Sequence, residues 1–134
     1  MTSDIVTYDG NMTFVERQYI EYKVYDDRGN AISQTVTGVM DETKTFDTLV
    51  AADKTDIKEI TNTYIGAGRV LGRAATSDIV TYDGNMSFAE RQYIEYKVYD
   101  DRGNATSQTI TGVLVELKSF GDLDAADKTD MKER

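Results

Sequence analysis

The stretch ERQYIEYKVYDDRGNA decides the fold: it occupies residues Glu16–Ala31 and recurs as Glu90–Ala105 without one change. In its first half, Ile20, Tyr22 and Val24 alternate with the other residues, which is the period-two pattern of a half-buried β-strand. Its second half, DDRGN, is typical of a tight turn closed by a glycine in the left-handed conformation. We therefore expect an antiparallel hairpin in each copy.

The repeat extends far beyond this stretch. Residues 2–60 and 76–134 align without a gap at an offset of 74, and 13 of the 59 aligned positions differ. The chain therefore divides into a first repeat copy (2–60), a connector (61–75) and a second repeat copy (76–134). A unit of this size is marginal on its own, so we expect the two copies to share one core, as the subunits of a homodimer do.

Each copy carries further signals around the hairpin. Asp4–Tyr8 reads as a short strand followed by turn residues, and Ala31–Met40 as the returning strand of the hairpin. Beyond residue 46 the apolar spacing approximates a helical stripe, formed by Leu49, Ala52, Ile57 and Ile60. The predicted fold class is α+β, mainly antiparallel β, with an internally duplicated β-β-β-α unit forming a pseudo-two-fold domain. The expected joint lies between the strands Gln18–Tyr25 and Gln92–Tyr99.

Composition restricts the available chemistry. The chain contains no Cys, no His, no Trp and no Pro. Without Cys and His it cannot form the usual structural zinc sites, a Cys/His nucleophile pair or a Ser-His-Asp triad. A metal would have to be a hard cation held by oxygen ligands. We therefore predict that the protein is not an enzyme and that it has no catalytic residues, no metal and no cofactor.

The charge balance indicates the kind of partner. The chain has 24 acidic and 15 basic residues, a net charge of −9 that is spread over both copies. Such a surface repels nucleic acid and anionic lipid and favours a basic partner. We expect a protein partner, no direct nucleic-acid binding and no membrane association. Neither a membrane-spanning apolar run nor a secretory signal is evident, so the expected location is cytoplasmic.

The candidate partner-binding residues are aromatic and apolar. Tyr19 and Tyr25, with their repeats Tyr93 and Tyr99, fall on the strand parity opposite to the expected core, and exposed aromatic side chains are common in protein interfaces. The alternative is that this face packs against the helix or the other copy. Seven of the 13 differences fall between positions 40 and 50, where the second copy gains an apolar patch around Val115 and Leu117. This patch would bind the connector or a second molecule.

Three functions are consistent with these patterns. The first is a non-enzymatic binding or structural module that acts as a fused pseudo-dimer and forms homo-oligomers. The second is a small acidic inhibitor that mimics nucleic acid, of the kind found in viruses or mobile elements. The third is a protein that binds a metal through oxygen ligands or binds carbohydrate.

Overall fold

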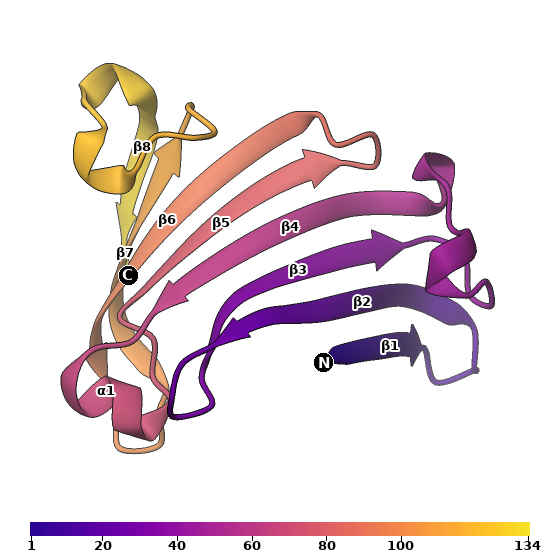
Figure 1. Cartoon of the computed structure of the whole chain (residues 1–134), viewed down its shortest axis with the longest axis horizontal. Coiled ribbons are helices and arrows are strands. Elements are labelled where there is room, and N and C mark those ends of the chain that lie inside the picture. The colour runs from indigo at the N-terminus through magenta and orange to yellow at the C-terminus, as the bar shows by residue number, and fades with distance from the viewer.

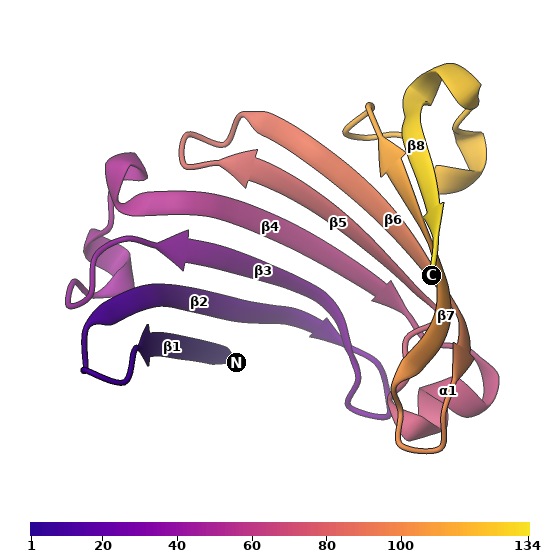
Figure 2. The same ribbon diagram turned by 180° about the vertical axis from the view of Figure 1, so that it is seen from behind.

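The computed structural model is built on one sheet of eight antiparallel strands, which lie side by side in the order of the chain (Figure 1). The structure describes residues 1–66 and 70–134. The strands are β1 (Thr2–Tyr8), β2 (Phe14–Tyr25), β3 (Ala31–Val39), β4 (Lys54–Thr63), β5 (Thr76–Asp83), β6 (Phe88–Tyr99), β7 (Ala105–Val113) and β8 (Lys128–Glu133). β1 and β8 form the two edges, which lie far apart in the view from behind (Figure 2).

Short helical segments connect some of the strands. They are α1 (Gly66–Leu71), η1 (Phe46–Thr48), η2 (Ala51–Asp53), η3 (Phe120–Asp122) and η4 (Ala125–Asp127). α1 lies in the connector, whereas the other four are 3₁₀ turns. We call residues 40–53, which join β3 to β4, the first loop, and residues 114–127, which join β7 to β8, the second loop. Among the described residues, no helix has the length and apolar character needed to cross a membrane.

The hairpin predicted from DDRGN is confirmed. The Asp26 carboxylate accepts hydrogen bonds from the backbone N–H groups of Arg28 and Asn30, both at 2.9 Å. Gly29 adopts a φ of 83°, and its N–H donates to the Asp26 carbonyl at 3.1 Å. An aspartate that binds the backbone of its own turn and a glycine with positive φ together fix the reversal of direction.

The two faces of the sheet differ because successive residues of a strand point to opposite sides. One face is covered by the two loops, and we call it the covered face. It carries Arg17, Tyr19, Thr37, Val39 and Ile57 from the first copy. The opposite face, which we call the groove face, carries Gln18, Ile20, Val36, Lys58 and Ile60. The most buried apolar side chains, Val39, Ile57, Tyr82 and Val113, lie where the loops shield the sheet.

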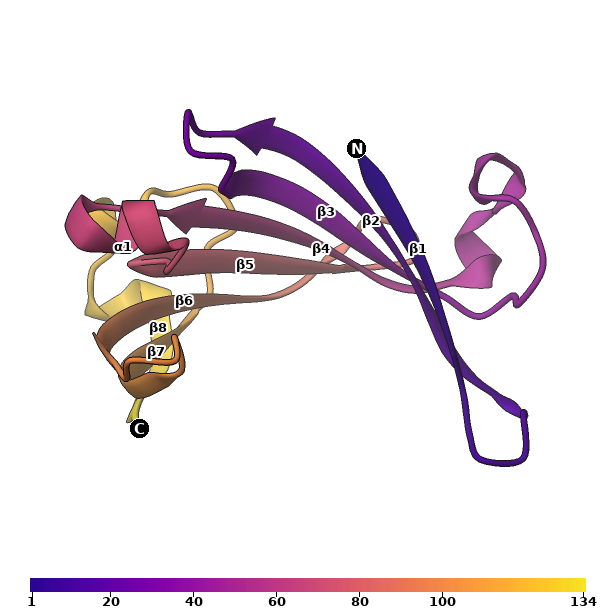
Figure 3. The same ribbon diagram turned by 90° about the horizontal axis from the view of Figure 1, so that it is seen from below.

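The sheet passes from one copy to the next without interruption. β4 pairs with β5 over eight residue pairs, from Asp56 opposite Asp83 to Thr63 opposite Thr76. At one end of this seam the hydroxyls of Thr63 and Thr76 are 2.6 Å apart, and Ser77 Oγ donates to the Asn62 side chain at 2.6 Å. Figure 3 shows that the sheet twists strongly from β1 to β8.

The predicted α+β class is wrong, because the structure is essentially all-β. The segment expected to form a helix consists of two 3₁₀ turns followed by β4. Ile57 pairs with Thr37 on one side and Tyr82 on the other, so ladder hydrogen bonds on both sides hold this segment in a strand. Each copy is therefore a unit of four strands rather than a β-β-β-α unit.

The predicted pseudo-two-fold arrangement is also wrong. β1 and β5 are four steps apart in an antiparallel sheet, so equivalent strands run in the same direction and the copies follow one another head to tail. A two-fold axis would instead reverse the order of equivalent strands across the joint, so that equivalent edges would meet there. The expected joint is misplaced as well, since β2 pairs with β1 and β3, and β6 with β5 and β7.

Candidate functional site

A buried arginine fastens each loop to the sheet. Arg17 is 4% exposed and binds the Asp4 carboxylate through two nitrogens, at 2.9 and 2.8 Å. Its remaining terminal nitrogen donates to the backbone carbonyls of Asp41 and Lys44, at 3.0 and 2.7 Å. The hydrogen bond from Arg17 lowers the pKa of Asp4, so this carboxylate stays ionised at neutral pH. One side chain thus joins β1, β2 and the first loop.

The second copy repeats this arrangement. Arg91 binds Asp78 at 2.8 and 2.7 Å and donates to the carbonyls of Val115 and Lys118 at 2.9 and 2.7 Å. The Asp78 side chain is 24% exposed, compared with 41% for Asp4. The difference arises because Asp78 lies in an inner strand, whereas Asp4 lies at the edge of the sheet.

Aromatic stacking closes each loop over the covered face. Phe46 of the first loop stacks on Tyr19, with ring centres 3.9 Å apart and planes 9° apart. The Lys54 ammonium lies 5.7 Å from the centre of the same phenylalanine ring. In the second copy Phe120 stacks on Tyr93 at 3.7 Å, and Lys128 lies 5.3 Å from the Phe120 ring. These contacts cover part of each ring and attach the loop to the strand.

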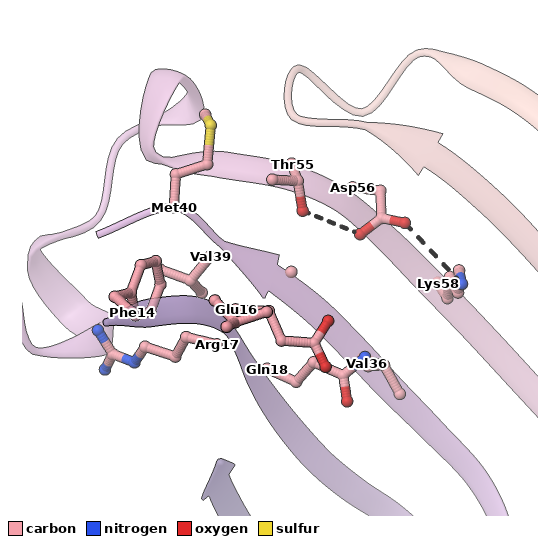
Figure 4. Close-up of a pocket in the computed structure, with 12 residues that line it drawn as sticks. Phe14, Glu16, Arg17, Gln18, Val36, Val39, Met40, Thr55, Asp56 and Lys58 are labelled. Atoms are coloured by element: carbon pink, nitrogen blue, oxygen red, sulfur yellow. Dashed lines mark hydrogen bonds and ion pairs between the residues drawn. The ribbon is translucent and has the colours of Figure 1, made fainter. Parts of the chain in front are cut away.

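On the groove face, the two copies carry equivalent shallow depressions. The first has a volume of about 350 Å³ and includes Glu16, Gln18, Val36, Asp56 and Lys58 (Figure 4). In the close-up, Asp56 on β4 is joined by dashed lines to Thr55, at 3.2 Å, and to Lys58, at 3.9 Å. The equivalent groove in the second copy, of about 320 Å³, includes Glu90, Gln92, Asp130 and Lys132. The polar lining of the two grooves is identical.

A glycine on β3 shapes the floor of this groove. A Cβ atom at Gly38 would collide with the side chains of Thr55 and Asp56. The register between β3 and β4 shifts next to it, between Thr37 and Val39. Gly38 therefore lies at a bulge between β3 and β4 and in close contact with β4. Gly112 has the same role next to Thr129 and Asp130.

A further pocket of about 290 Å³ lies on the covered face where the copies meet. Its lining includes Glu59, Asp78 and Arg91 together with the second loop at Glu116–Ser119. Beside it, Tyr82 donates a hydrogen bond to Glu116 at 2.9 Å. Burial, together with this hydrogen bond to Glu116, raises the pKa of Tyr82 to about 12. The phenol is therefore protonated at neutral pH and serves as a hydrogen-bond donor rather than as a base.

The predicted tyrosine surface is divided between both faces. Tyr19 and Tyr93 lie on the covered face beneath the phenylalanines of the loops. The register of β2 against β3 shifts between Tyr22 and Tyr25, so the Tyr25 ring lies 6.3 Å from the groove-face ring of Tyr22. Tyr25 is 41% exposed, whereas the Tyr99 hydroxyl donates to the Ala74 carbonyl. The simple alternation of parity along β2 could not reveal these bulges.

The two predicted apolar residues of the second loop have different surroundings. Val115 is partly buried, and its carbonyl accepts the hydrogen bond from Arg91. Leu117 is 87% exposed and belongs to the lining of the 290 Å³ pocket where the two copies meet, which we call the seam pocket. The role of both residues in partner binding stays a prediction. Arg17 and Arg91 were not identified from the sequence, because the period-two pattern places both on the strand face opposite to the expected core. The one sequence signal for these anchors is that each arginine follows an aspartate by 13 residues, as Arg17 follows Asp4 and Arg91 follows Asp78.

The hydrogen bonds of Arg17 and Arg91 join the strands to the loops that cover them. Among the described residues, no group of three Asp or Glu side chains is placed to hold a metal ion. In comparisons with known proteins, no family model, curated protein or solved structure matches the chain. The candidate site is therefore defined by its own geometry: two equivalent grooves, two anchored loops and one seam.

Proposed function

We propose that the protein is a non-enzymatic structural module whose repeats carry one continuous sheet and display the same surface twice. The pairing of β4 with β5 is the main support for this proposal. Through it, each copy provides backbone hydrogen bonds to an edge strand of the other copy. The exposure of equivalent residues supports this: Ile57 is 6% exposed beside Tyr82, whereas Met131 at the same repeat position on the edge is 58% exposed.

The polar groups of the covered face support a structural role. Each arginine uses its guanidinium to bind one carboxylate and two loop carbonyls, and such charge-assisted hydrogen bonds are the strong ones in proteins. Lys44 pairs with Asp53 within the first loop, and Lys118 pairs with Asp127 within the second, both at 3.0 Å. These interactions stabilise the loops in the conformation that covers the sheet.

The experiment compares the full chain with residues 76–134 alone, by light scattering coupled to size exclusion and by circular dichroism. A structural role in one shared sheet predicts that the full chain is folded, and that the single copy either unfolds or associates. A folded, monomeric single copy would contradict the proposal, because the protein would then consist of two tethered modules.

The paired grooves favour binding of a basic protein segment as a second candidate function. Each groove presents two carboxylates and one lysine, in addition to an arginine that is already bound to an aspartate and two loop carbonyls. The chain as a whole carries a net charge of −9. Two equal sites on one rigid sheet would bind a bivalent partner with increased avidity. The inhibitor that mimics nucleic acid and the metal or carbohydrate protein stay hypotheses that no observation here favours.

An oligolysine peptide tests this second function in an NMR titration of the full chain. Binding in the grooves predicts shifts centred on Gln18, Lys58 and their repeats, which are lost in the variant carrying Asp56→Asn and Asp130→Asn. A matched control carries Glu21→Gln and Glu95→Gln on the covered face and should bind as the unchanged chain does. Chemical shift changes spread evenly over all acidic positions would contradict binding in the grooves.

A further inference from the structure

The two edge strands of the sheet, β8 and β1, are the repeats of β4 and β5, which pair with each other inside the molecule. β8 occupies the repeat position of β4, and β1 occupies that of β5. The segment TSDIVTYD is identical in residues 2–9 and 76–83, and DIKE of β4 differs from DMKE of β8 at one residue. β4 and β5 pair over eight residues within the chain. The edges thus carry nearly the same sequences as the seam.

The exposure of equivalent residues shows what each edge lacks. Tyr82 of β5 is 7% exposed beside β4, whereas Tyr8 of β1 is 39% exposed. Met131 of β8 and Ile57 of β4 differ in the same way. Unpaired edge strands present free backbone N–H and C=O groups together with these apolar side chains, and both become buried when a strand is added.

A pair of equivalent glycines provides an independent observation. A Cβ atom at Gly84 would lie 2.6 Å from the carbonyl oxygen of Ala51 and 2.8 Å from that of Lys54, so the turn after β5 packs closely on the preceding copy. The equivalent Gly10, after β1, has no atom within 4 Å of the corresponding position. The β1 edge therefore has the close-packing turn of the seam but not the backbone that the turn contacts.

The charges of β8 do not distinguish it from β4. Lys54, Asp56, Lys58 and Glu59 have the same charges as Lys128, Asp130, Lys132 and Glu133, and β4 nevertheless pairs with β5. Charged residues often protect the edges of sheets, but here the same set already occurs within a paired ladder. Arg134 in place of Ile60 removes one apolar contact, so pairing at the edge is weaker than at the seam.

We infer that β8 of one molecule pairs antiparallel with β1 of a second copy of this chain, in the register that β4 adopts with β5. Transferring that register places Met131 opposite Tyr8, Lys132 opposite Thr7 and Glu133 opposite Val6. The association is head to tail, so it extends the sheet and generates rings or open filaments rather than a two-fold dimer. This inference rests on the structural role proposed above.

Engineered cysteines test the inference in the full chain, which has no cysteine of its own. Thr7→Cys and Lys132→Cys are introduced into separate chains, both at exposed edge positions, and the mixture is oxidised mildly. Because pairing raises the effective concentration of the two thiols, the mixed disulfide should form about tenfold faster than in a mixture of Ser3→Cys with Lys132→Cys. Ser3 lies on the same face but about 13 Å along the strand from Thr7, at ~3.3 Å per residue.

Two further variants make the outcome decisive. Gly10→Ala, added to the Thr7→Cys chain, should reduce the cross-linking rate several-fold without changing the circular dichroism spectrum, since the added methyl group meets open space within one molecule. Lys58→Cys with Thr81→Cys in one chain is the positive control for the seam. If this control fails to cross-link, the proposed structural role fails; if the control succeeds and the mixed disulfide does not form, the edge pairing alone is overturned.

Other products would overturn the inference in different ways. A predominance of Thr7–Thr7 or Lys132–Lys132 disulfides would indicate two-fold pairing of like edges. A chain carrying both cysteines that cross-links only within itself would indicate closure of the sheet in one molecule. Products of two and more chains, increasing with protein concentration, are the expected result.

Discussion

At the scale of single residues, one buried arginine in each copy joins two strands and a loop. Each binds one carboxylate from the neighbouring strand and two carbonyls from the loop that covers it. Removing either arginine leaves these acceptors without a charged donor. Because Asp78 is shielded more than Asp4, the second copy should be the more sensitive of the two.

Arg91→Met should lower the free energy of unfolding by about 2–3 kcal/mol, since hydrogen bonds to charged groups contribute ~1.5–3 kcal/mol and the acceptors left behind are partly buried. Urea unfolding followed by circular dichroism measures the change. Lys118→Met is the matched control: it removes an ion pair whose lysine is about half exposed, and such pairs contribute ~0–1 kcal/mol. Equal effects of the two substitutions would show that Arg91 is not an anchor.

Tyr82 should make the free energy of unfolding decrease at alkaline pH. Its pKa is raised from 10.0 to about 12, so the folded state favours the protonated phenol. The stabilisation is fully present below about pH 10 and is lost as the pH rises through about 12. Tyr82→Phe should therefore lose less of its melting temperature between pH 9 and pH 11.5 than the unchanged chain does. Tyr25→Phe, at a tyrosine that is 41% exposed, is the control, and an equal effect there would contradict a special role for Tyr82.

At the scale of elements, the seam is where the two copies interact. The turn after β5 lies against the carbonyls of Ala51 and Lys54, which belong to the first copy. Gly84 is required there because a side chain would meet backbone atoms, which cannot rotate away. The same glycine in the first copy, Gly10, has no such neighbour.

Gly84→Ala should consequently destabilise the full chain by about 1–3 kcal/mol, which is the usual cost of forcing an extra carbon into a closely packed site. Gly10→Ala should change the stability of the monomer by less than ~0.5 kcal/mol, as surface substitutions usually do. Thermal unfolding at low protein concentration compares the two. If both alanines have the same effect, the turn does not pack on the preceding copy.

The elements also show how far sequence could predict this structure. The hairpin at Asp26–Asn30 was predictable because a glycine with positive φ and an aspartate that binds its own turn act locally. β4 was not, because the spacing of Ile57 and Ile60 resembles a helical stripe in isolation. Its strand conformation is determined by two neighbours, β3 and β5, and β5 belongs to the other copy.

At the scale of the whole molecule, the duplication was evident but its geometry was not. Two copies of one sequence can associate about a two-fold axis or head to tail, and the repeat itself is compatible with both. The registers between strands decide for the head-to-tail arrangement. The candidate sites were only partly predictable for the same reason: the grooves and the seam pocket combine residues from neighbouring strands, and their pairing was not known.

The head-to-tail arrangement has a consequence for assembly. Each copy has one edge like β1 and one edge like β4 or β8, so the association that joins the copies within a chain can also join chains. Surfaces such as the two grooves would then recur at regular intervals along an extended sheet. A multivalent partner would bind such an array with greater avidity than it binds one molecule.

The contact between β4 and β5 in solution is the most direct test of the continuous sheet. Nuclear Overhauser effects between backbone protons should connect Ile60 with Ile79 and Asn62 with Ser77 in a dilute, isotopically labelled sample of the full chain, because these residues are direct partners in the seam. Observation of both contacts is the predicted result. Their absence, with the contacts between β2 and β3 intact, would show two separate repeat units and contradict the continuous sheet.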